Sequence, residues 1–435
     1  MKPSNSTSQS FRFIFLLYIY VICGFAILYM LPHAHNGKLS FIDALFVSTS
    51  SLSVTGLSSI DIATDFTRTG QALLMLEMQL GGIGILVIMS YLFLLLGKKM
   101  TVSNMLLISK DQNQSNLKTI KTLSFSVLFI AIFIETICYF IIYEDIESLY
   151  NDKSEAIFVS AFHAVSSFTN AGFTLFDLHS FEQNGVFLLA TAFTIFLGSI
   201  GFPTIMEYTF AFRKKKSLFS KINVRLHTSL FLIGAILYVV LEFNRAFGHL
   251  NLVDKFVNAI FLSATTRSGG LATIDSATLG TTTVLIVMCF MFIGGASSST
   301  GGGIRLTTFR VIIARIISVV RNDDQVIIGR KAISQEAVNK SFLIFTSFVV
   351  LSVISTIILT LFQSQNLLSI GFEVLSAISN TGLSMGITDE LASVSKLILI
   401  FLMIIGRIGI FTFIYFIFKV EKSKLKYLEE DLAVG

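Results

Sequence analysis

The sequence predicts an all-α polytopic membrane protein built from four covalently linked repeats. Three observations predict this fold. The 435 residues are 53% hydrophobic and only 14% charged, whereas a soluble domain carries roughly a quarter charged residues. Long apolar runs alternate with basic loops, and one glycine motif recurs four times between them. Each repeat is expected to hold a span, a re-entrant half-helix and a second span, which gives eight transmembrane spans and four re-entrant segments around a pseudo-fourfold axis.

Each expected repeat opens and closes on an apolar run long enough to cross a bilayer, which takes about 20 residues. In pairs, the expected spans lie near residues 11–32 and 70–97, 122–143 and 184–212, 226–247 and 281–320, and 342–363 and 395–418. No small-residue cleavage site follows the first run, so it is expected to be a span and not a removed signal. The repeats are therefore expected at residues 1–97, 98–212, 213–320 and 321–420, followed by a charged tail at 421–435.

The charge distribution predicts the orientation in the membrane. Basic residues crowd three loops: Lys98, Lys99, Lys110, Lys118 and Lys121 in the first, Arg213, Lys214, Lys215, Lys216 and Lys221 in the second, and Arg315, Arg321, Arg330, Lys331 and Lys340 in the third. The alternate loops are neutral or acidic. By the positive-inside rule, the basic loops, both termini and the tail face the cytoplasm of a cell-membrane protein. The basic loops are short and lack interleaved aromatic residues, so no nucleic-acid partner is expected.

The recurring motif places a small or hydroxyl residue before a glycine and a large apolar residue after it. Its copies are SVTGL (53–57), TNAGF (169–173), RSGGL (267–271) and SNTGL (379–383), and each second span carries its own glycine cluster, LGGIG (80–84), LGSIG (197–201), IGGAS (293–297) and IGRIG (405–409). The intervals Gly56–Gly81, Gly172–Gly198, Gly270–Gly294 and Gly382–Gly406 are 25, 26, 24 and 24 positions. Four near-equal spacings are hard to produce by chance, so the pattern indicates an internal repeat.

The segments before the four motifs are too short to cross a bilayer. Each holds about 11–15 helix-like residues. A single glycine in a membrane helix most often lets two helices approach closely, but the fourfold recurrence favours re-entrant half-helices that enter from the non-cytoplasmic side. Their glycines would meet inside the membrane, where non-helical backbone survives only if it lines a cavity or is buried in protein.

Four such segments around one axis would form a pore lined by backbone carbonyls. Glycine suits this role because it adopts positive φ freely and leaves no side chain in the pore. A ring of carbonyl oxygens replaces the hydration shell of a monovalent cation, and inward-pointing helix C-termini add partial negative charge. No carboxylate occupies any of the four motifs, which disfavours a ring for divalent ions.

At this point the chain resembles the superfamily of K⁺ transporters that includes the Trk, Ktr and plant HKT proteins. The resemblance covers residues 11–420, and the absence of extra N-terminal spans makes the chain more similar to the KtrB branch than to the longer TrkH type. It implies a K⁺ filter of backbone carbonyls, which we expect at Thr55, Gly56, Ala171, Gly172, Gly269, Gly270, Thr381 and Gly382. Alignment of RSGGL with the other motifs selects Gly270 as the third filter glycine. Gly56 favours K⁺, because a serine there goes with Na⁺ preference in some plant relatives.

The segment GGASSSTGGG (294–303) interrupts the second span of the third repeat. A glycine inside a helix costs about 1 kcal/mol relative to alanine, so a continuous helix is implausible there. The counterparts LGGIG, LGSIG and IGRIG keep enough apolar residues to remain helical. No Gly-Lys-Ser/Thr follows, which disfavours a phosphate-binding loop. The resemblance implies a gate below the filter, which we expect at Gly294, Gly295, Ser297, Ser298, Ser299, Thr300, Gly301, Gly302 and Gly303, with Arg407.

Arg407 lies near the middle of the last span, where a charge is costly and usually functional. The resemblance places the matching arginine close to the gate. We therefore expect Arg407 to form an electrostatic barrier and to anchor the loop through serine hydroxyls or backbone carbonyls.

Six further polar residues in or near the expected membrane segments are assigned from their positions. Three acids in spans are either proton-relay candidates or, as favoured, partners of groups on neighbouring helices: Glu77, Glu135 and Glu207. Glu373 is expected to start the fourth half-helix, where an acid suits the helix dipole. Arg267 and Asp275 flank the third motif and are expected to brace it, as an extracellular ion pair or through backbone contacts.

The expected function is passive K⁺ translocation by the pore subunit of a Ktr-type uptake system. The resemblance implies a homodimer and a cytoplasmic KtrA-like ring of RCK domains that binds ATP or ADP. No cofactor is expected in this chain, and Na⁺ stays a candidate activator. One alternative is a Na⁺-selective or Na⁺-coupled member of the superfamily. The other is a polytopic membrane enzyme, which is disfavoured because His, Asp and Cys do not cluster at one depth.

Overall fold

The computed structural model describes residues 5–85, 87, 120–209 and 215–417. This part of the chain is mostly helical with very little sheet, which confirms the expected all-α class. Its one sheet is a short antiparallel hairpin of β1 (Ile327–Ile328) and β2 (Lys331–Ala332) in the third basic loop, which the sequence did not predict. The expected repeat boundaries stay predictions, and the tail 421–435 lies outside the described residues.

The first span of each repeat is one long apolar helix. These helices are α1 (Asn5–Tyr29), α7 (Ile120–Glu147), α11 (Leu218–Glu242) and α15 (Gln335–Thr360). Among the described residues they are the four single helices long and apolar enough to cross a membrane, and only 22–39% of each apolar window is buried in the protein. Exposed side chains such as Phe140 and Val240, both 70% exposed, therefore suit contact with lipid.

Four short helices correspond to the expected half-helices. They are α2 (Phe41–Ser53), α8 (Lys153–Thr169), α12 (Leu252–Thr265) and α16 (Leu367–Ser379). Each begins at a polar N-cap whose side chain accepts a backbone N–H: Ser40, Asp152, Asn251 and Asn366. Such caps satisfy the orphan donors of the first helical turn. Each half-helix then runs inward to a buried C-terminal end.

The second spans are interrupted in every repeat, so the expectation that only the third copy breaks is wrong. They comprise α4 (Arg68–Ile83), α9 (Gly185–Ser199) with α10 (Phe202–Thr209), α13 (Thr281–Phe292) with α14 (Leu306–Val320), and α17 (Ser393–Ile408) with α18 (Ile410–Ile417). Gly84, Gly201 and Gly409 have φ of 98°, 93° and 90°, and α9 meets α10 at 100°. A glycine with positive φ ends a helix at little cost, which explains the breaks. The remainder of the expected span 70–97 beyond residue 87 lies outside the described residues.

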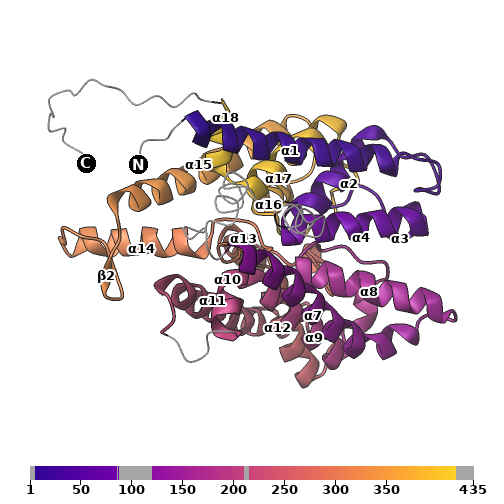
Figure 1. Ribbon diagram of the computed structural model, residues 1–435. Helices are drawn as coiled ribbons and strands as arrows, with labels where there is room; N and C mark the ends of the chain where they lie inside the picture. Colours follow the sequence, from indigo (N-terminus) through magenta and orange to yellow (C-terminus); the bar gives the residue numbers. More distant parts are fainter. Residues whose placement is uncertain (1–4, 86, 88–119, 210–214, 418–435) are drawn as a thin grey trace.

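The helices pack in a cyclic order. Each half-helix packs on the first span of its own repeat, and each second span packs on the half-helix of the next repeat: α4 on α8, α9 on α12, α13 on α16, and α17 on α2. Figure 1 shows α1, α2, α4, α16, α17 and α18 on one side and α7, α8, α9, α11 and α12 on the other. The last repeat thus closes against the first, since α18 also packs on α1. This arrangement produces the expected pseudo-fourfold axis.

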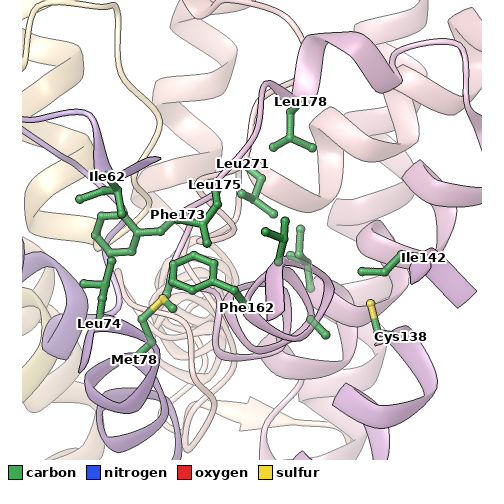
Figure 2. Packing of buried hydrophobic residues seen from close by; sticks show 14 of the residues in the cluster. Ile62, Leu74, Met78, Cys138, Ile142, Phe162, Phe173, Leu175, Leu178 and Leu271 are labelled. Carbon is green, nitrogen blue, oxygen red and sulfur yellow. The ribbon is translucent and has the colours of Figure 1, made fainter. Parts of the chain in front are cut away.

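Hydrophobic clusters fill the space between neighbouring repeats. In the largest, Phe162 of α8 lies beside Met78 of α4, and Phe173 from the loop after α8 lies nearby (Figure 2). Phe162 stands ten positions before the second motif glycine, and Phe46 and Phe372 stand at the same distance before the first and fourth. All three side chains are fully buried. The recurring phenylalanine is therefore a packing residue in three of the four half-helices, and Ile260 takes its place in the third.

Short helical turns follow three of the half-helices. They are α3 (Ile62–Asp65), η2 (Leu178–Phe181) and η3 (Ser276–Thr278). On the opposite side, α14 and α15 run side by side to the hairpin and project beyond the other helices (Figure 1). Ala314, Val326, Ile328 and Val338 form a small cluster that joins the hairpin to these helices.

Candidate functional site

The inner ends of the four half-helices share one backbone turn. A residue with positive φ stands two positions before each motif glycine: Val54 at 58°, Asn170 at 61°, Ser268 at 95° and Asn380 at 51°. A non-glycine residue with positive φ is uncommon, and such strain is found mostly at functional sites. The turn directs the next two residues of each motif toward a common centre.

The four motif glycines meet at that centre. Gly56, Gly172, Gly270 and Gly382 have φ of 96°, 75°, 68° and 89°. A Cβ added to Gly56 would lie 2.6 Å from the Ala171 carbonyl oxygen, and one on Gly270 would lie 2.9 Å from that of Thr381. A Cβ on Gly382 would overlap the carbonyl oxygen of Thr55.

The structure therefore brings together the residues that the sequence placed in the filter. Gly269 differs from the other members, because a Cβ there would lie 2.8 Å from Cα of Thr265 in its own half-helix. Gly270 is the third member of the ring, as the motif alignment indicated.

Two serines hold the backbone of the first and fourth motifs. Gly56 N–H donates to Ser50 Oγ and Gly382 N–H donates to Ser376 Oγ, both at 3.0 Å. These N–H groups are thus satisfied by the last turn of the half-helix, which leaves the carbonyl oxygens at the centre. Sequence reasoning missed both serines. The signal was a serine six positions before the glycine, a place that Ala264 takes in the third repeat.

The third repeat departs from this pattern at Arg267. Helix α12 ends at Thr265, five positions before Gly270, whereas the other half-helices end three positions before their glycines. Arg267 is only 2% exposed, and its guanidinium donates to the carbonyl oxygens of His227 at 2.8 Å and Gly294 at 3.2 Å. We expected Arg267 to brace this motif either through an ion pair or through backbone contacts, and the structure shows the backbone contacts.

Asp275 does not pair with Arg267. Its carboxylate accepts the backbone N–H of Ala277 at 2.9 Å and so caps η3. The expected alternative of an extracellular ion pair between Arg267 and Asp275 is therefore wrong.

Residues 294–303, called the glycine-rich loop below, lie against the bend of the second repeat. The backbone N–H groups of Ala296 and Thr300 donate to the carbonyl oxygens of Ser199 and Gly198 at 2.9 and 3.3 Å. The amide of Asn170 hydrogen-bonds the Thr300 hydroxyl at 2.8 Å. Since Asn170 precedes a motif glycine by two positions, the loop reaches the base of the second motif.

Hydroxyl and backbone groups together provide further hydrogen bonds for the loop. The hydroxyls of Ser297 and Thr307 pair at 2.7 Å, and Ser299 Oγ donates to the Ala296 carbonyl at 2.7 Å. The carbonyl of Ser298 accepts the N–H of Phe202 at 3.0 Å. Within the loop, Gly295 N–H donates to the carbonyl of Gly302 at 3.1 Å, while Gly301 and Gly303 are buried beside them. Buried backbone without regular secondary structure thus has defined partners.

Arg407 joins the loop to two other repeats. Its guanidinium, on α17, donates to the backbone carbonyls of Thr300 and Gly81. The expected contact with the loop is therefore present, through backbone carbonyls and not through serine hydroxyls.

A second set of glycines explains the near-equal spacing of the motifs. A Cβ at Gly81, Gly198 or Gly406 would overlap the carbonyl oxygen of Leu52, Phe168 or Ile378, respectively. Each of these carbonyls lies four positions before a motif glycine. In the third repeat, Gly294 instead lies against the carbonyl of Gly302 in the loop. In three repeats, the glycine of the second span therefore allows close contact with the end of a half-helix. In the third repeat, it allows close contact with the glycine-rich loop.

The three acids in the expected spans are paired across helices. Glu77, fully buried, accepts from Tyr29 Oη at 2.5 Å and Ser48 Oγ at 2.6 Å. Glu135 accepts from Gln79 Nε2 at 2.8 Å, and Glu207 accepts from the Ser217 hydroxyl at 2.7 Å. This geometry agrees with the favoured interpretation as pairing residues. In the part of the chain that the structure describes, no three His, Cys, Asp or Glu side chains form a metal site.

Glu373 does not start its half-helix, so that expectation is wrong. It is the seventh residue of α16 and fully buried. Its carboxylate accepts from Ser384 Oγ at 2.5 Å, and from Met385 N and Thr388 Oγ1 at 3.0 Å each. It therefore fixes the chain just past Gly382.

The comparisons with known proteins agree with this geometry. Residues 13–426 match the TrkH family, described as a cation transport protein. The chain belongs to the TrkH family. It is similar to the Ktr system potassium uptake proteins D and B of Bacillus subtilis, with 36% and 33% identity over 98% and 96% of this chain and 97% and 95% of theirs. The fold is similar to that of the potassium transporter TrkH from Vibrio parahaemolyticus, with a TM-score of 0.77 at 18% identity over 95% of this chain and 85% of that one.

Membership of the TrkH family settles three expectations. The suspected superfamily is confirmed, and with it the fold class of a multi-pass membrane protein. The family consists of transport proteins, so the alternative of a membrane enzyme is wrong. In the described residues, four helices qualify as spans by length and composition, or five if the bent pair α9–α10 counts as one.

Proposed function

We propose that this chain is the K⁺-translocating pore subunit of a Ktr-type potassium uptake system in the cell membrane. The observation that carries the proposal is the meeting of Gly56, Gly172, Gly270 and Gly382, all with positive φ, at the inner ends of four half-helices. The whole-length similarity to two Ktr system potassium uptake proteins supports it.

The ring of four motifs acts as the ion filter. Carbonyl oxygens at Thr55, Gly56 and their counterparts replace the hydration shell of K⁺. The half-helix C-termini point at the same centre and add partial negative charge there. Ions move passively, driven by concentration and by a membrane potential worth about 2.3 kcal/mol per charge per 100 mV.

The glycine-rich loop acts as the gate on the cytoplasmic side of the filter. Its contacts with Asn170 and Arg407 support this assignment, because they hold the loop against the second motif and against the second span of the fourth repeat. The positive charge of Arg407 adds an electrostatic barrier to cations at this point. Both termini of the chain lie in the cytoplasm, following the basic loops.

Control comes from a cytoplasmic partner, a KtrA-like ring of RCK domains that binds ATP or ADP, on a homodimer of this chain. The projection of α14, the hairpin and α15 provides a surface for it, with Arg321, Arg330 and Lys331 exposed. A nucleotide shifts the gate only if the ATP-bound and ADP-bound rings differ in their affinity for the open and closed forms of this chain. Helix α14 continues directly from the loop, so a force on the projection reaches the gate.

Growth of K⁺-uptake-deficient cells tests the proposal. We expect the chain, co-expressed with its regulatory partner, to restore growth at low K⁺. A membrane-inserted variant Gly382→Asp serves as the control, because its side chain would block the filter. Failure of the inserted native chain to restore growth would overturn the proposal.

A Na⁺-selective or Na⁺-coupled transporter is the second candidate. Gly56→Ser, followed by measurement of K⁺ and Na⁺ permeability in proteoliposomes, separates the two and also tests the filter. We expect the K⁺/Na⁺ ratio to fall. If the ratio does not move, the assignment of Gly56 to the filter is wrong.

A further inference from the structure

Ser268 has the least regular backbone of the four turn residues. Its φ of 95° lies outside the left-handed region that Val54, Asn170 and Asn380 adopt at 51–61°. A serine there is strained, and glycine would fit the same backbone without cost. Ser268 is nevertheless fully buried next to the motif glycines. The side chain therefore contributes something that glycine lacks.

That contribution is a hydroxyl placed between the glycine-rich loop and the fourth motif. Ser268 Oγ accepts the backbone N–H of Gly302 at 2.9 Å and donates to the carbonyl oxygen of Asn380 at 2.8 Å. Gly302 belongs to the loop, and Asn380 stands two positions before Gly382. One side chain thus uses both its donor and an acceptor to join two backbone segments that lie 78 positions apart.

Packing holds the three segments in close contact. A Cβ added to Gly302 would lie 2.6 Å from Cβ of Asn380, and one added to Gly301 would lie 3.2 Å from Cβ of Ser268. No side chain fits between the loop and the turn. Movement of Gly302 by more than about 1 Å therefore breaks its bond to Ser268.

The other turn residues make different contacts. The Asn170 amide bonds to Thr300 of the loop. The Asn380 amide donates to Thr55 Oγ1 at 2.9 Å, and so joins the fourth motif to the first. Among the four turn residues, only Ser268 forms side-chain hydrogen bonds to both the loop and another motif; the Asn380 side chain packs against Gly302 without such a bond.

We propose that Ser268 is a positioning residue that couples the position of the glycine-rich loop to the geometry of the fourth filter motif. With the loop in place, the hydroxyl is oriented by Gly302 N–H toward Asn380. When the loop moves away, the hydroxyl loses this partner and the Asn380 carbonyl loses its fixed donor. Gating and ion preference are then linked. The inference rests on the proposed filter and gate.

The test compares Ser268→Ala, Ser268→Gly and a matched control, Ser263→Ala. Ser268→Ala removes the hydroxyl and keeps the strained backbone, whereas Ser268→Gly removes both. Ser263 lies five positions earlier, in half-helix α12, and its hydroxyl donates to the Phe231 carbonyl at 2.6 Å, outside the loop. Full-length chains are placed in proteoliposomes without the regulatory partner, and K⁺ flux and the K⁺/Na⁺ permeability ratio are measured.

We expect both Ser268 variants to raise partner-independent K⁺ flux roughly tenfold, the ratio that loss of one or two hydrogen bonds produces. We expect their K⁺/Na⁺ ratio to fall about threefold. The control should keep native values. The same substitutions are then made in a chain that lacks residues 298–300. Because the shortened loop no longer holds Gly302 in place, Ser268→Ala should add nothing further to K⁺ flux in that background.

Three results would overturn the coupling. Flux that rises in Ser268→Gly but not in Ser268→Ala assigns the effect to backbone strain. Unchanged flux in both variants removes the role of the hydroxyl. An undiminished effect in the shortened loop shows that Ser268 acts on the filter alone. Absence of K⁺ flux in the native chain, with or without the partner, would instead contradict the proposed function itself.

Discussion

The third repeat differs from the other three in how its second span meets its half-helix. In the first, second and fourth repeats, a span glycine lies against a half-helix carbonyl, as Gly406 does against Ile378. In the third, Gly294 lies against Gly302 of the glycine-rich loop. The loop therefore takes the place that a half-helix occupies elsewhere. The third repeat thus has a contact between two glycines where the other repeats have a contact between two helices.

The end of the half-helix differs in the same repeat. Serine at the sixth position before the motif glycine holds the first and fourth motifs, whereas the third has Ala264 there. Arg267 and Ser268 bond to the loop region instead. The first and fourth motifs are thus held by serines of their own half-helices, whereas the second and third motifs both bond to the loop.

The largest expected effect is that of a side chain at the centre. Gly382→Ala places a Cβ against the Thr55 carbonyl at a backbone with φ of 89°. The clash involves backbone on both sides, so neither can yield. We expect K⁺ uptake to be lost completely in a chain that still inserts into the membrane, as measured by rubidium uptake in cells.

Gly386→Ala is the matched control for this substitution. Gly386 also has a positive φ, 76°, but no atom lies within 4 Å of an added Cβ. The strain costs about 1–2 kcal/mol, and uptake should persist. Equal loss of uptake in both variants would attribute the effect to the backbone angle and not to the crowded centre.

The next largest effect concerns the contact between a span glycine and a half-helix carbonyl, which the third repeat lacks. Gly406→Ala sets a Cβ against the Ile378 carbonyl and 2.5 Å from Oδ1 of Asn380. Overpacking of this kind costs about 1–3 kcal/mol. Thermal unfolding in detergent should occur at a clearly lower temperature than in the native chain.

Gly371→Ala provides the comparison within α16. There an added Cβ meets only the flexible end of Met288 at 3.5 Å. Alanine favours the helix by about 1 kcal/mol, so this variant should be slightly more stable. A Gly406→Ala chain as stable as Gly371→Ala would contradict the close contact between span and half-helix.

Substitution of Arg407 tests whether the fourth repeat holds the glycine-rich loop in place. Arg407→Ala deletes two donors to the Thr300 and Gly81 carbonyls and removes a positive charge. We expect partner-independent K⁺ flux to rise roughly tenfold. Arg407→Lys keeps the charge but not the two-pronged geometry. An intermediate flux in the lysine variant would separate the two contributions, whereas native flux and gating in Arg407→Ala would exclude this role.

The smallest effect should come from making the fourth repeat resemble the third. Ser376→Ala removes the acceptor of the Gly382 N–H, as Ala264 does naturally in the third repeat. We expect the K⁺/Na⁺ permeability ratio to fall about threefold. Ser352→Ala, whose hydroxyl donates to Phe348 within α15, is the control and should keep the native ratio. A native ratio in Ser376→Ala would show that the fourth motif does not need this bond.

Much of the architecture could be predicted because it depends on hydropathy and spacing. The run expected at 122–143 is α7 (Ile120–Glu147), and the expected half-helices end at their glycine motifs. Apolar length and repeat period determine such elements almost alone. The residues of the centre could also be selected, since only glycine tolerates both the backbone angle and the crowding there.

Individual backbone angles and partners could not be predicted. The breaks at Gly84, Gly201 and Gly409 depend on one φ angle each, and glycine is compatible with a helix as well as with its end. Glu373 was misplaced because an acid in a half-helix suits the N-terminus on its own. Its three donors come from residues 384–388, beyond the motif.

The sequence by itself determined the membrane class, the fourfold repeat, the four central glycines and the position of the interrupted third repeat. These follow from composition and spacing along the chain. Only the tertiary structure decided which atoms meet: Arg407 with the carbonyls of Thr300 and Gly81, and Ser268 between Gly302 and Asn380. The physical reason is that backbone carbonyls and N–H groups are the same in every residue. A sequence cannot show which of them a side chain will reach until the helices are packed.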